Sequence, residues 1–436
     1  MRSRNLIAVA AAAATLAACS DSPITAGDDH VALPLDIQAP AEEIVAGEVL
    51  VKTRPGEDLG AVMRDYGFSG QVSFDVLVTE PSSARLTMIR AEAGQERALA
   101  ARLATDARVE YAEPNYLRRL HAIRAETWAF RNDGTRRIFF TRGAGKGQVV
   151  TSKIPVVDAD EDNVESYGAG GTAVVVGSID TGVDFLHQEF FSGQLIAGRD
   201  WIDNDNDPSD SQGHGTHTTG TMVGGTVGVS GVSGAGANVK VYVQRVCGRR
   251  GCPTSAIASA IRAGADQAGM VALNLSLGGP SLSQAERDAI AYALSKNVLV
   301  IASSGNDGDN TISCPACDPN AIAVGATTWS DTRSYYSNFG SGLDISAPGG
   351  ELFSNTSQEG GIFSSIPGGY AYYQGTSMAA PQVTGTAGIV ASKTTLRGAN
   401  LRSRLLGTAD NIGSGFGSGR LNSYRAVTNS TLPSPQ

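Results

Sequence analysis

Charge, aromatic side chains and cysteine are all scarce in this sequence. Of the 436 residues, 18% are charged, 6% are aromatic and five are cysteines. The net charge of −9 at pH 7 argues against nucleic-acid binding, because neutralising phosphates needs stripes of basic residues. The arginine-rich stretch from Arg118 to Lys146 is local, and we interpret it as the solvated face of a linker. With 53 glycines and 17 prolines, the composition indicates a loop-rich globular protein.

Two motifs of other hydrolases are missing as well. No serine lies in a Gly-x-Ser-x-Gly motif, which argues against an α/β-hydrolase. His214 and His217 invite a metal interpretation, but the His-Glu-x-x-His motif of zinc peptidases is absent. We therefore interpret His217 as structural, and His187 as a surface or packing residue.

The N-terminus has the features of an export signal. Arg2 and Arg4 precede an apolar run, Leu6 to Ala18, which is too short to span a bilayer and reads as a signal peptide. The run ends in Leu-Ala-Ala-Cys, which resembles a bacterial lipoprotein signal, where the cysteine carries the lipid. We expect an exported bacterial protein, either secreted after processing or held at the cell envelope by a lipid on Cys19. An ordinary cleavage site with an incidental cysteine is the alternative.

The other four cysteines form two close pairs in the sequence, Cys247 with Cys252 and Cys314 with Cys317. In an exported protein, such pairs favour two disulfides. A four-cysteine zinc site is the alternative, although the two pairs lie in separate loops.

The pattern of apolar residues predicts a small domain at residues 46–121, after a signal peptide (1–19) and a linker (20–45). Alternation indicates strands, and helical spacing indicates two helices. The expected elements are strand 48–53, helix 59–66, strands 72–79 and 84–90, helix 95–104 and strand 109–112. The order βαββαβ predicts a ferredoxin-like α+β domain.

Residues 122–170 are a connecting segment of uncertain structure, with strands expected at 135–141 and 148–157. A second domain, residues 171–430, has long apolar strands separated by helices, expected at 254–268 and 283–296. The strands are expected at 173–179, 239–243, 271–275 and 298–302. Nearly unbroken apolar strands fit a parallel sheet that is buried on both faces. We predict a doubly wound, mainly parallel α/β fold, with the site beyond the carboxyl ends of the strands.

Four polar residues in glycine-flanked motifs lie at or beyond these strand ends. Asp180 ends a strand in Asp-Thr-Gly, His214 opens a helix in His-Gly-Thr-His, and Asn306 follows a strand in Ser-Gly-Asn. Ser377 lies in Gly-Thr-Ser-Met-Ala-Ala-Pro, just before a helix expected at 379–391. Acyl transfer needs a nucleophile, an imidazole base, a carboxylate that orients the imidazole, and donors for the oxyanion.

These motifs and their order resemble those of the subtilisin-like serine proteases, the subtilases of the S8 peptidase family. The resemblance covers residues 171–425 and implies a serine endopeptidase that acts on polypeptides and needs no cofactor for catalysis. It implies that Ser377 is the nucleophile, His214 the general base and Asp180 the carboxylate that orients the imidazole. Asn306 would form the oxyanion hole with the backbone N–H of Ser377.

The resemblance also implies how substrate is held. Ser276, Leu277 and Gly278 would lie on an edge strand that takes up extended substrate. The wall of the pocket for the residue before the scissile bond would include Ala302, Ser303 and Gly305, with Ser313 near its base. Because this wall has no evident charge, we expect it to accept many side chains of the residue before the scissile bond, with a preference for apolar ones.

The βαββαβ segment resembles the inhibitory propeptide of subtilases, of the inhibitor-I9 type. In that family the propeptide is an intramolecular chaperone and inhibitor whose tail occupies the active site until self-cleavage. By position, the tail here would be Glu113 to His121, and the cut bond would lie between Tyr116 and Ala125.

The acidic run at residues 203–210 resembles a calcium loop that some subtilases carry before the histidine motif. Alternating carboxylates suit a hard cation, so the candidate ligands of a structural Ca²⁺ are Asp203, Asp205, Asp207 and Asp210. A solvated acidic loop is the alternative. Another calcium loop of the family is expected to be missing, because Val223 to Gly236 is short and poor in asparagine.

Two other functions remain open at this point. One is a catalytically silent subtilase that acts as a binding or scaffold lipoprotein, and the other is a maturase that processes a single partner. The membrane would be contacted only through the lipid.

Overall fold

The computed structural model describes residues 44–67, 74–79, 84–120, 123–124, 137–144, 148–155, 171–225, 238–351 and 360–430. The predicted signal peptide, with Cys19, lies outside these residues, as does most of the segment where a calcium loop is expected to be missing. Within the described ranges, no helix is both long enough and apolar enough to cross a bilayer.

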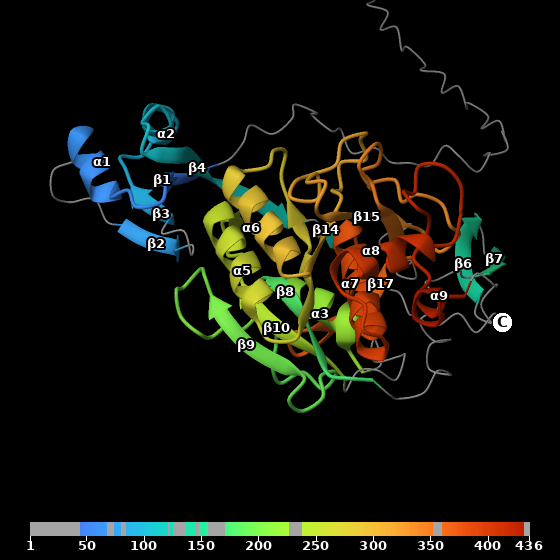
Figure 1. Ribbon diagram of the computed structural model, residues 1–436. Helices are drawn as coiled ribbons and strands as arrows, with labels where there is room; N and C mark the ends of the chain where they lie inside the picture. The colour runs from blue at the N-terminus through green and yellow to red at the C-terminus, as the bar shows by residue number, and fades with distance from the viewer. Residues whose placement is uncertain are drawn as a thin grey trace, which may run out of the picture. The chain divides into compact units, whose positions relative to one another are not determined.

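A seven-stranded parallel sheet forms the centre of the second domain (Figure 1). Its strand order is β16-β15-β14-β12-β8-β10-β9. This arrangement confirms the predicted doubly wound, mainly parallel α/β fold. The bounds are β8 Val174–Asp180, β9 Leu195–Asp200, β10 Val239–Arg245, β12 Met270–Leu275, β14 Leu299–Ser303, β15 Ile322–Thr327 and β16 Ile345–Pro348.

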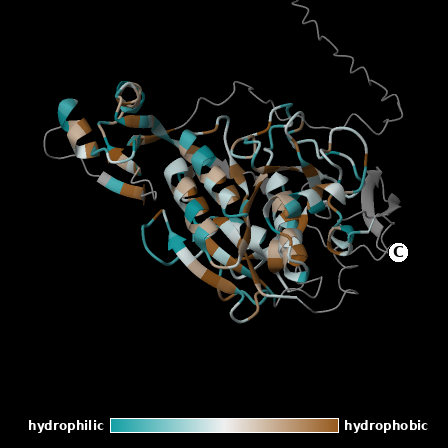
Figure 2. Cartoon of the chain, in the orientation of Figure 1, coloured by the Kyte–Doolittle hydropathy of each residue, from teal (hydrophilic) through white to brown (hydrophobic). Residues whose placement is uncertain are grey.

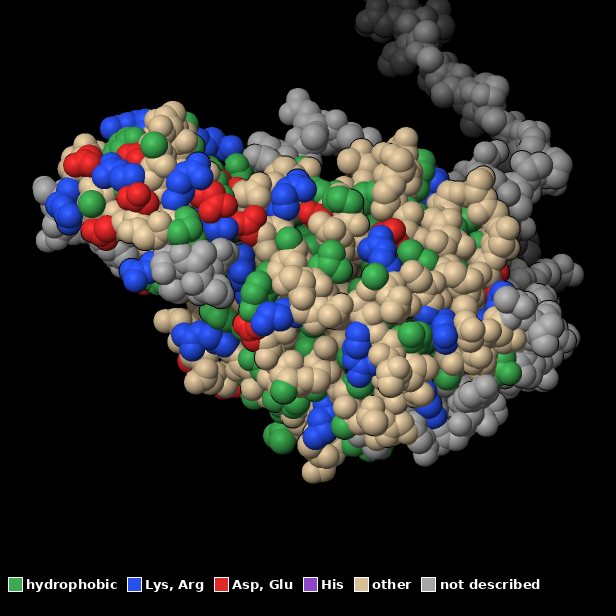
Figure 3. Space-filling model, in the orientation of Figure 1, with side chains coloured by type: hydrophobic (Ala, Val, Ile, Leu, Met, Phe, Trp, Pro, Cys, Tyr) green, Lys and Arg blue, Asp and Glu red, His purple; other side chains and the backbone are tan. Residues whose placement is uncertain are grey.

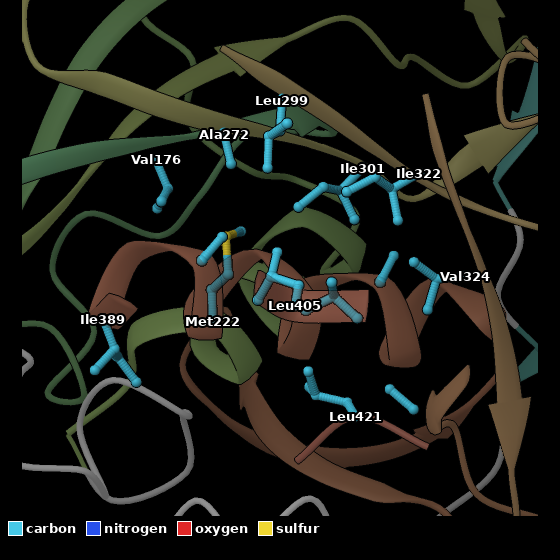
Figure 4. Close-up of a cluster of buried hydrophobic side chains, with 14 of the residues drawn as sticks. Val176, Met222, Ala272, Leu299, Ile301, Ile322, Val324, Ile389, Leu405 and Leu421 are labelled. Carbon is cyan, nitrogen blue, oxygen red and sulfur yellow. The ribbon is translucent and has the colours of Figure 1, made fainter. Parts of the chain in front are cut away.

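Helices cover both faces of this sheet. Successive side chains of a strand point to opposite faces, so an unbroken apolar strand needs a packing partner on each side. Val175 and Ile179 of β8 pack in one cluster with residues of α5 and α6, whereas Val174 and Val176 pack in another with residues of α3, α7 and α8. Figure 4 shows part of the latter cluster, with Met222 facing the sheet. The helices are α3 His214–Val223, α5 Thr254–Asp266, α6 Gln284–Ser295, α7 Thr376–Lys393, α8 Gly398–Gly407 and α9 Ser423–Thr428.

The small domain has the predicted order βαββαβ, with an antiparallel sheet in the order β4-β1-β3-β2. Its own core includes Val51, Met63 and Leu103, and α1 carries both hydrophobic and hydrophilic residues (Figure 2). The bounds are β1 Ile44–Thr53, α1 Leu59–Asp65, β2 Phe74–Thr79, β3 Arg85–Arg90, α2 Glu96–Leu103 and β4 Val109–Leu120.

β4 is much longer than the predicted strand at 109–112. Its first half pairs with β1, and its second half pairs with two short strands of the second domain, β11 (Cys252–Pro253) and β13 (Leu277–Gly278). The sequence of the second half, Pro-Asn-Tyr-Leu-Arg-Arg-Leu, does not alternate in polarity. Its extended conformation therefore follows from its partners and not from a local pattern.

Five further strands lie near the site or in the connecting segment. β6 (Arg137–Ala144) and β7 (Gln148–Pro155) pair with each other, within a few residues of the strands expected there. β17 (Ile362–Ile366) and β18 (Gly369–Gln374) form a hairpin that the sequence did not predict. β18 also pairs with β5 (Ile123–Arg124).

Candidate active site

The end of β8 and the start of α3 bring Asp180 and His214 together. The Nδ1–H of His214 donates a hydrogen bond of 2.7 Å to Oδ1 of Asp180. Two glycines allow this approach. Gly213 turns the chain into α3 at φ 98°, and a Cβ on Gly215 would lie 2.1 Å from the carbonyl oxygen of Gly182. Gly215, inside the His-Gly-Thr-His motif, thus permits a backbone contact that a larger residue would prevent, and Gly213, just before the motif, supplies the left-handed turn.

Further hydrogen bonds fix the carboxylate of Asp180. Its Oδ1 also accepts the N–H of Thr181 at 2.7 Å, and its Oδ2 accepts the hydroxyl of Thr218 at 3.2 Å. A carboxylate that accepts from Nδ1 places the proton of the neutral imidazole there and leaves Nε2 as the acceptor. Nε2 of His214 is buried and has no hydrogen-bond partner among the described residues. Because buried polar atoms are normally paired, this nitrogen is suited to receive a proton.

Asp210 ties the loop after β8 to the start of α3. Its Oδ1 accepts the hydroxyl of Thr181 at 2.9 Å and the N–H groups of Gln212 and Gly213 at 2.8 and 2.9 Å. Its Oδ2 accepts the N–H and the hydroxyl of Thr216 at 2.9 and 2.6 Å. Asp210 thereby positions the segments that carry the carboxylate and the imidazole. Sequence reasoning missed this role because the residue ends an acidic run and looked like a cation ligand.

The four aspartates of the acidic run all have hydrogen-bond or ion-pair partners within the protein. Asp203 forms an ion pair with Arg245, Asp205 accepts the N–H of Asp207 at 2.9 Å, and Asp207 accepts the hydroxyl of Ser209. Within the described ranges, no three acidic, histidine or cysteine side chains are grouped as metal ligands. These carboxylates take part in local hydrogen bonds and ion pairs, and a structural Ca²⁺ at this loop stays a prediction.

Ser377 is the second residue of α7 and is fully buried. Its hydroxyl donates to the carbonyl oxygen of Ser276 at 3.1 Å, and the hydroxyl of Ser276 donates in return to the carbonyl oxygen of Ser377 at 2.8 Å. In this geometry the serine hydroxyl is not bonded to His214. The first turn of a helix supplies unpaired N–H groups and the positive end of its dipole, both of which favour an anion beside Ser377.

The side chain of Asn306 is oriented by the residue before the serine. Its Oδ1 accepts both the N–H of Thr376 at 3.0 Å and the hydroxyl of Thr376 at 2.8 Å. Since N–H groups require an acceptor, the oxygen of the amide is assigned to this side. The amide nitrogen therefore lies on the opposite side, as a donor next to the start of α7.

The predicted substrate strand is already paired, with a segment of the same chain. In β13, Leu277 lies opposite Leu120 and Gly278 opposite Arg119. On its other edge, β4 pairs with Cys252 and Pro253 of β11. After residues 121 and 122, β5 pairs with Tyr373 and Gln374 of β18, three residues before Ser377. The chain is therefore held in extended form on two sides of Ser377.

The other predicted substrate residues differ in their surroundings. Gly305 and Ser313 are adjacent, because a Cβ on Gly305 would lie 2.4 Å from the hydroxyl oxygen of Ser313. Ser303, the last residue of β14, is fully buried. Ala302 is part of the hydrophobic cluster beneath α5 and α6. The structure thus brings Gly305 and Ser313 together, and places Ala302 in the core.

Both cysteine pairs form disulfides, Cys247 with Cys252 and Cys314 with Cys317. The first ends in β11, beside β4. The second begins at Cys314, whose backbone exchanges two hydrogen bonds with Gly279, at 2.9 and 2.8 Å. The two disulfides thus adjoin the two strand edges that hold the end of β4, and the four cysteines do not share a metal.

The other two described histidines have structural contacts. His217 is fully buried, its Nε2 donates to the carbonyl oxygens of Ile362 and Ala371 at 3.0 and 3.2 Å, and burial lowers its pKa to about 3. His187 packs against Phe190 and Tyr370. No histidine is visible on the face drawn in Figure 3.

The interpretation of the arginine-rich stretch as solvated is wrong at its first residue. The side chain of Arg118 is 1% exposed and forms a salt bridge of 2.7 Å with Glu286, which is 0% exposed. The charge of Arg118 is thus paired inside the protein, at the end of β4.

Comparisons with known proteins agree on one family. The model of the subtilase family matches residues 171–426, more than half of the chain. The thermophilic serine proteinase of Bacillus sp. (strain AK1) is 37% identical over 328 residues, 73% of this chain and 73% of that protein. Thermitase of Thermoactinomyces vulgaris is 36% identical over 263 residues, 59% of this chain and 90% of thermitase. A solved structure of a cold-adapted subtilisin-like serine proteinase is 32% identical with a TM-score of 0.52, covering 63% of this chain and 94% of that one.

Proposed function

The chain belongs to the subtilase family of serine peptidases, and we propose that it cleaves polypeptides through Ser377, His214 and Asp180 after maturing from a zymogen. The observation that carries this proposal is the hydrogen bond of 2.7 Å between His214 and a fully buried Asp180, with Nε2 of the imidazole left as an unpaired acceptor. A silent scaffold protein would not need this arrangement. We therefore favour an active endopeptidase.

In the proposed mechanism, the hydroxyl oxygen of Ser377 attacks the carbonyl carbon of the scissile peptide bond. Nε2 of His214 takes the hydroxyl proton and passes it to the leaving amine, while Asp180 stabilises the imidazolium. The hydroxyl must first leave the carbonyl oxygen of Ser276, to which it donates in this structure. Water then hydrolyses the acyl-enzyme by the same route, with His214 again acting as the base.

The test of this function is labelling with a fluorophosphonate, which reacts with activated serines. We expect the self-processed protein to be labelled on the peptide that contains Ser377, and a His214→Ala variant to be labelled far more slowly because the serine then lacks its base. A processed wild-type protein that takes up no label would contradict the proposal.

The contacts between β4 and two helices support the zymogen. The amide oxygen of Asn115 accepts the N–H of Ser255 at 2.9 Å, in the first turn of α5. The carboxylate of Glu113 accepts the N–H groups of Gln284 and Ala285, at the start of α6, at 2.8 and 2.9 Å. Burial nevertheless raises the pKa of Glu113 to about 7. β4 thus accepts hydrogen bonds from N–H groups in the first turns of two helices, which have no partner within their own helix. This pairing fixes the position at which β4 docks.

The pairing of the chain on both sides of Ser377 narrows the expected cleavage site. β4 is paired up to Leu120, and pairing resumes at Ile123. We expect self-cleavage at one of the bonds between Leu120 and Ile123. N-terminal sequencing and intact mass of the mature protein check this, and a first cut elsewhere, at a bond before Arg118 for example, would contradict it.

Replacing Asn306 by leucine tests the oxyanion hole. Leucine keeps the size of the side chain but cannot donate to the oxyanion, which it would form with the N–H of Ser377. We expect kcat to fall by about 10²–10³-fold with little change in KM, since the lost donor acts on charge that develops in the transition state. Steady-state kinetics on a peptide check this, and a change confined to KM would argue against the assignment.

We further propose export and a lipid on Cys19. The support is in the sequence, where a positively charged start, an apolar run and Leu-Ala-Ala-Cys follow one another. Mass spectrometry of the N-terminal peptide from a membrane fraction would detect the lipid, and an unmodified Cys19 or a cut before it by another signal peptidase would contradict it.

A further inference from the structure

Arg118 is a residue of β4 whose side chain the second domain encloses almost completely, leaving it 1% exposed. It lies opposite Cys252 in the pairing with β11. On the other side, a Cβ on Gly279 would lie only 2.9 Å from Cδ of Arg118 and 3.1 Å from Nη1. The glycine therefore leaves just enough room for this side chain, which passes beside the backbone and into the protein.

The guanidinium of Arg118 forms hydrogen bonds with the buried carboxylate of Glu286. Nε of Arg118 donates to Oε1 of Glu286 at 3.2 Å, and Nη2 donates to Oε2 of Glu286 at 2.7 Å. Nη2 also donates to the carbonyl oxygen of Ser281. Two parallel N–H donors on one carboxylate form the bidentate geometry that arginine can adopt and lysine cannot.

Glu286 belongs to the peptidase domain and is held there independently of β4. It is the third residue of α6, where its Oε2 accepts the N–H of Ser283 at 3.1 Å and its own N–H donates to the hydroxyl of Ser283 at 3.1 Å. This capping box keeps the carboxylate in place when the tail leaves. A buried carboxylate without a cationic partner is unfavourable, so the vacated position attracts another cation.

We propose that Glu286, Ser281 and Gly279 form a subsite for an arginine side chain of the substrate, three to five positions before the scissile bond. This inference rests on the proposed function, because it takes the end of β4 to lie where substrate lies. An extended chain between β11 and β13 presents its backbone to the same two edges and its side chain to the same pocket. The neutral pocket expected for the residue before the cut is a separate site.

A competition between two peptides tests the subsite. Both have the sequence of residues 114–126, and one carries Arg118→citrulline, which keeps the shape of arginine but removes its charge. The full-length protein is allowed to process itself, both peptides are added together, and their consumption is followed by mass spectrometry. The ratio of the two rates does not depend on how much enzyme is active. A third peptide, Arg119→citrulline, controls for loss of net charge.

We expect the peptide with arginine at position 118 to be consumed about thirtyfold faster, or about 2 kcal/mol at 1.4 kcal/mol per factor of ten, the lower end for a truncated buried charge pair. The rate at which the Arg119→citrulline peptide is consumed should fall much less. In a Glu286→Gln variant, whose glutamine can still complete the capping box, the preference should fall to about threefold or less. Asp288→Asn removes a charge from the same helix, where Asp288 pairs with Lys52, and should leave the preference intact.

The outcomes separate the subsite from the proposed function. If wild-type protein consumes the arginine and citrulline peptides at equal rates, and Ser377→Ala abolishes both, then the subsite is overturned while the peptidase stands. If no peptide is cut, or if Ser377→Ala cuts as well as wild type, then the proposed function fails and the subsite with it. The wild-type comparison alone decides, so the result holds even if Glu286→Gln does not fold.

Discussion

Replacing Ser377 by alanine should lower kcat on a peptide substrate by about 10⁶-fold, the scale known for loss of the triad serine in subtilisin. The variant has no nucleophile, and a water molecule held by the remaining residues is a poor substitute. The fold should be unaffected, because the hydroxyl makes one hydrogen bond, to the carbonyl oxygen of Ser276 at 3.1 Å, worth about 1 kcal/mol. Activity assays and thermal melting of the same preparation check both points.

The same variant should stop maturation. If the tail is removed by the chain's own Ser377, full-length Ser377→Ala will keep the bonds between Leu120 and Ile123 intact, and its mass will remain that of the precursor. Ser295→Ala is a matched control, since Ser295 lies at the end of α6 and, among the described residues, its hydroxyl bonds only the carbonyl oxygen of Tyr292. Processing of Ser377→Ala in a purified sample would show that another residue cuts the chain.

The fold and much of the site could be predicted because local patterns encode them. Unbroken apolar strands such as β8 predict a sheet that is buried on both faces. Glycine-flanked polar residues at strand ends predict a site at one edge, and the structure joins Asp180 to His214 there. The motif for Ser377 is followed by small residues, which predicted the helix at 379–391; α7 contains this range but begins three residues earlier, at Thr376.

Asp210 and Arg118 show what local patterns could not reveal. A carboxylate that ends an acidic run looks the same in sequence whether it binds a cation or holds backbone N–H groups. Only the folded loop shows that Asp210 bonds Thr216 and its neighbours. Likewise, an arginine in a basic stretch looks solvated, and its burial depends on Glu286, which is 168 residues away in sequence. Tertiary contacts decide both roles.

The short strands were missed for a related reason. β11 and β13 each have two residues, too few for any periodicity, and they are extended because they pair with β4. In turn, the second half of β4 is a strand only because these edges receive it. Such mutual pairing is a property of the assembled fold, and it is also the property that a substrate would exploit.

Replacing Asp180 by asparagine should lower kcat by up to about 10⁴-fold, the loss known when the carboxylate of such a triad becomes an amide. The imidazolium of His214 then loses its buried counter-charge. The orientation of the amide is also predictable. The N–H of Thr181 and Nδ1–H of His214 both need an acceptor at the Oδ1 position, so the amide oxygen should remain there.

In that orientation the amide nitrogen faces Thr218, whose hydroxyl can accept from it and still donate to the carbonyl oxygen of Gly215, at 3.2 Å in this structure. The tautomer of His214 is then preserved. Asparagine should therefore remain more active than alanine, which accepts a hydrogen bond from neither Thr181 nor His214. Kinetics of Asp180→Asn and Asp180→Ala check this order, and equal activities would mean that the amide turns and reverses the tautomer. Adding Asp180→Asn to Ser377→Ala should cost almost nothing more, because residues that act as a unit do not contribute additively.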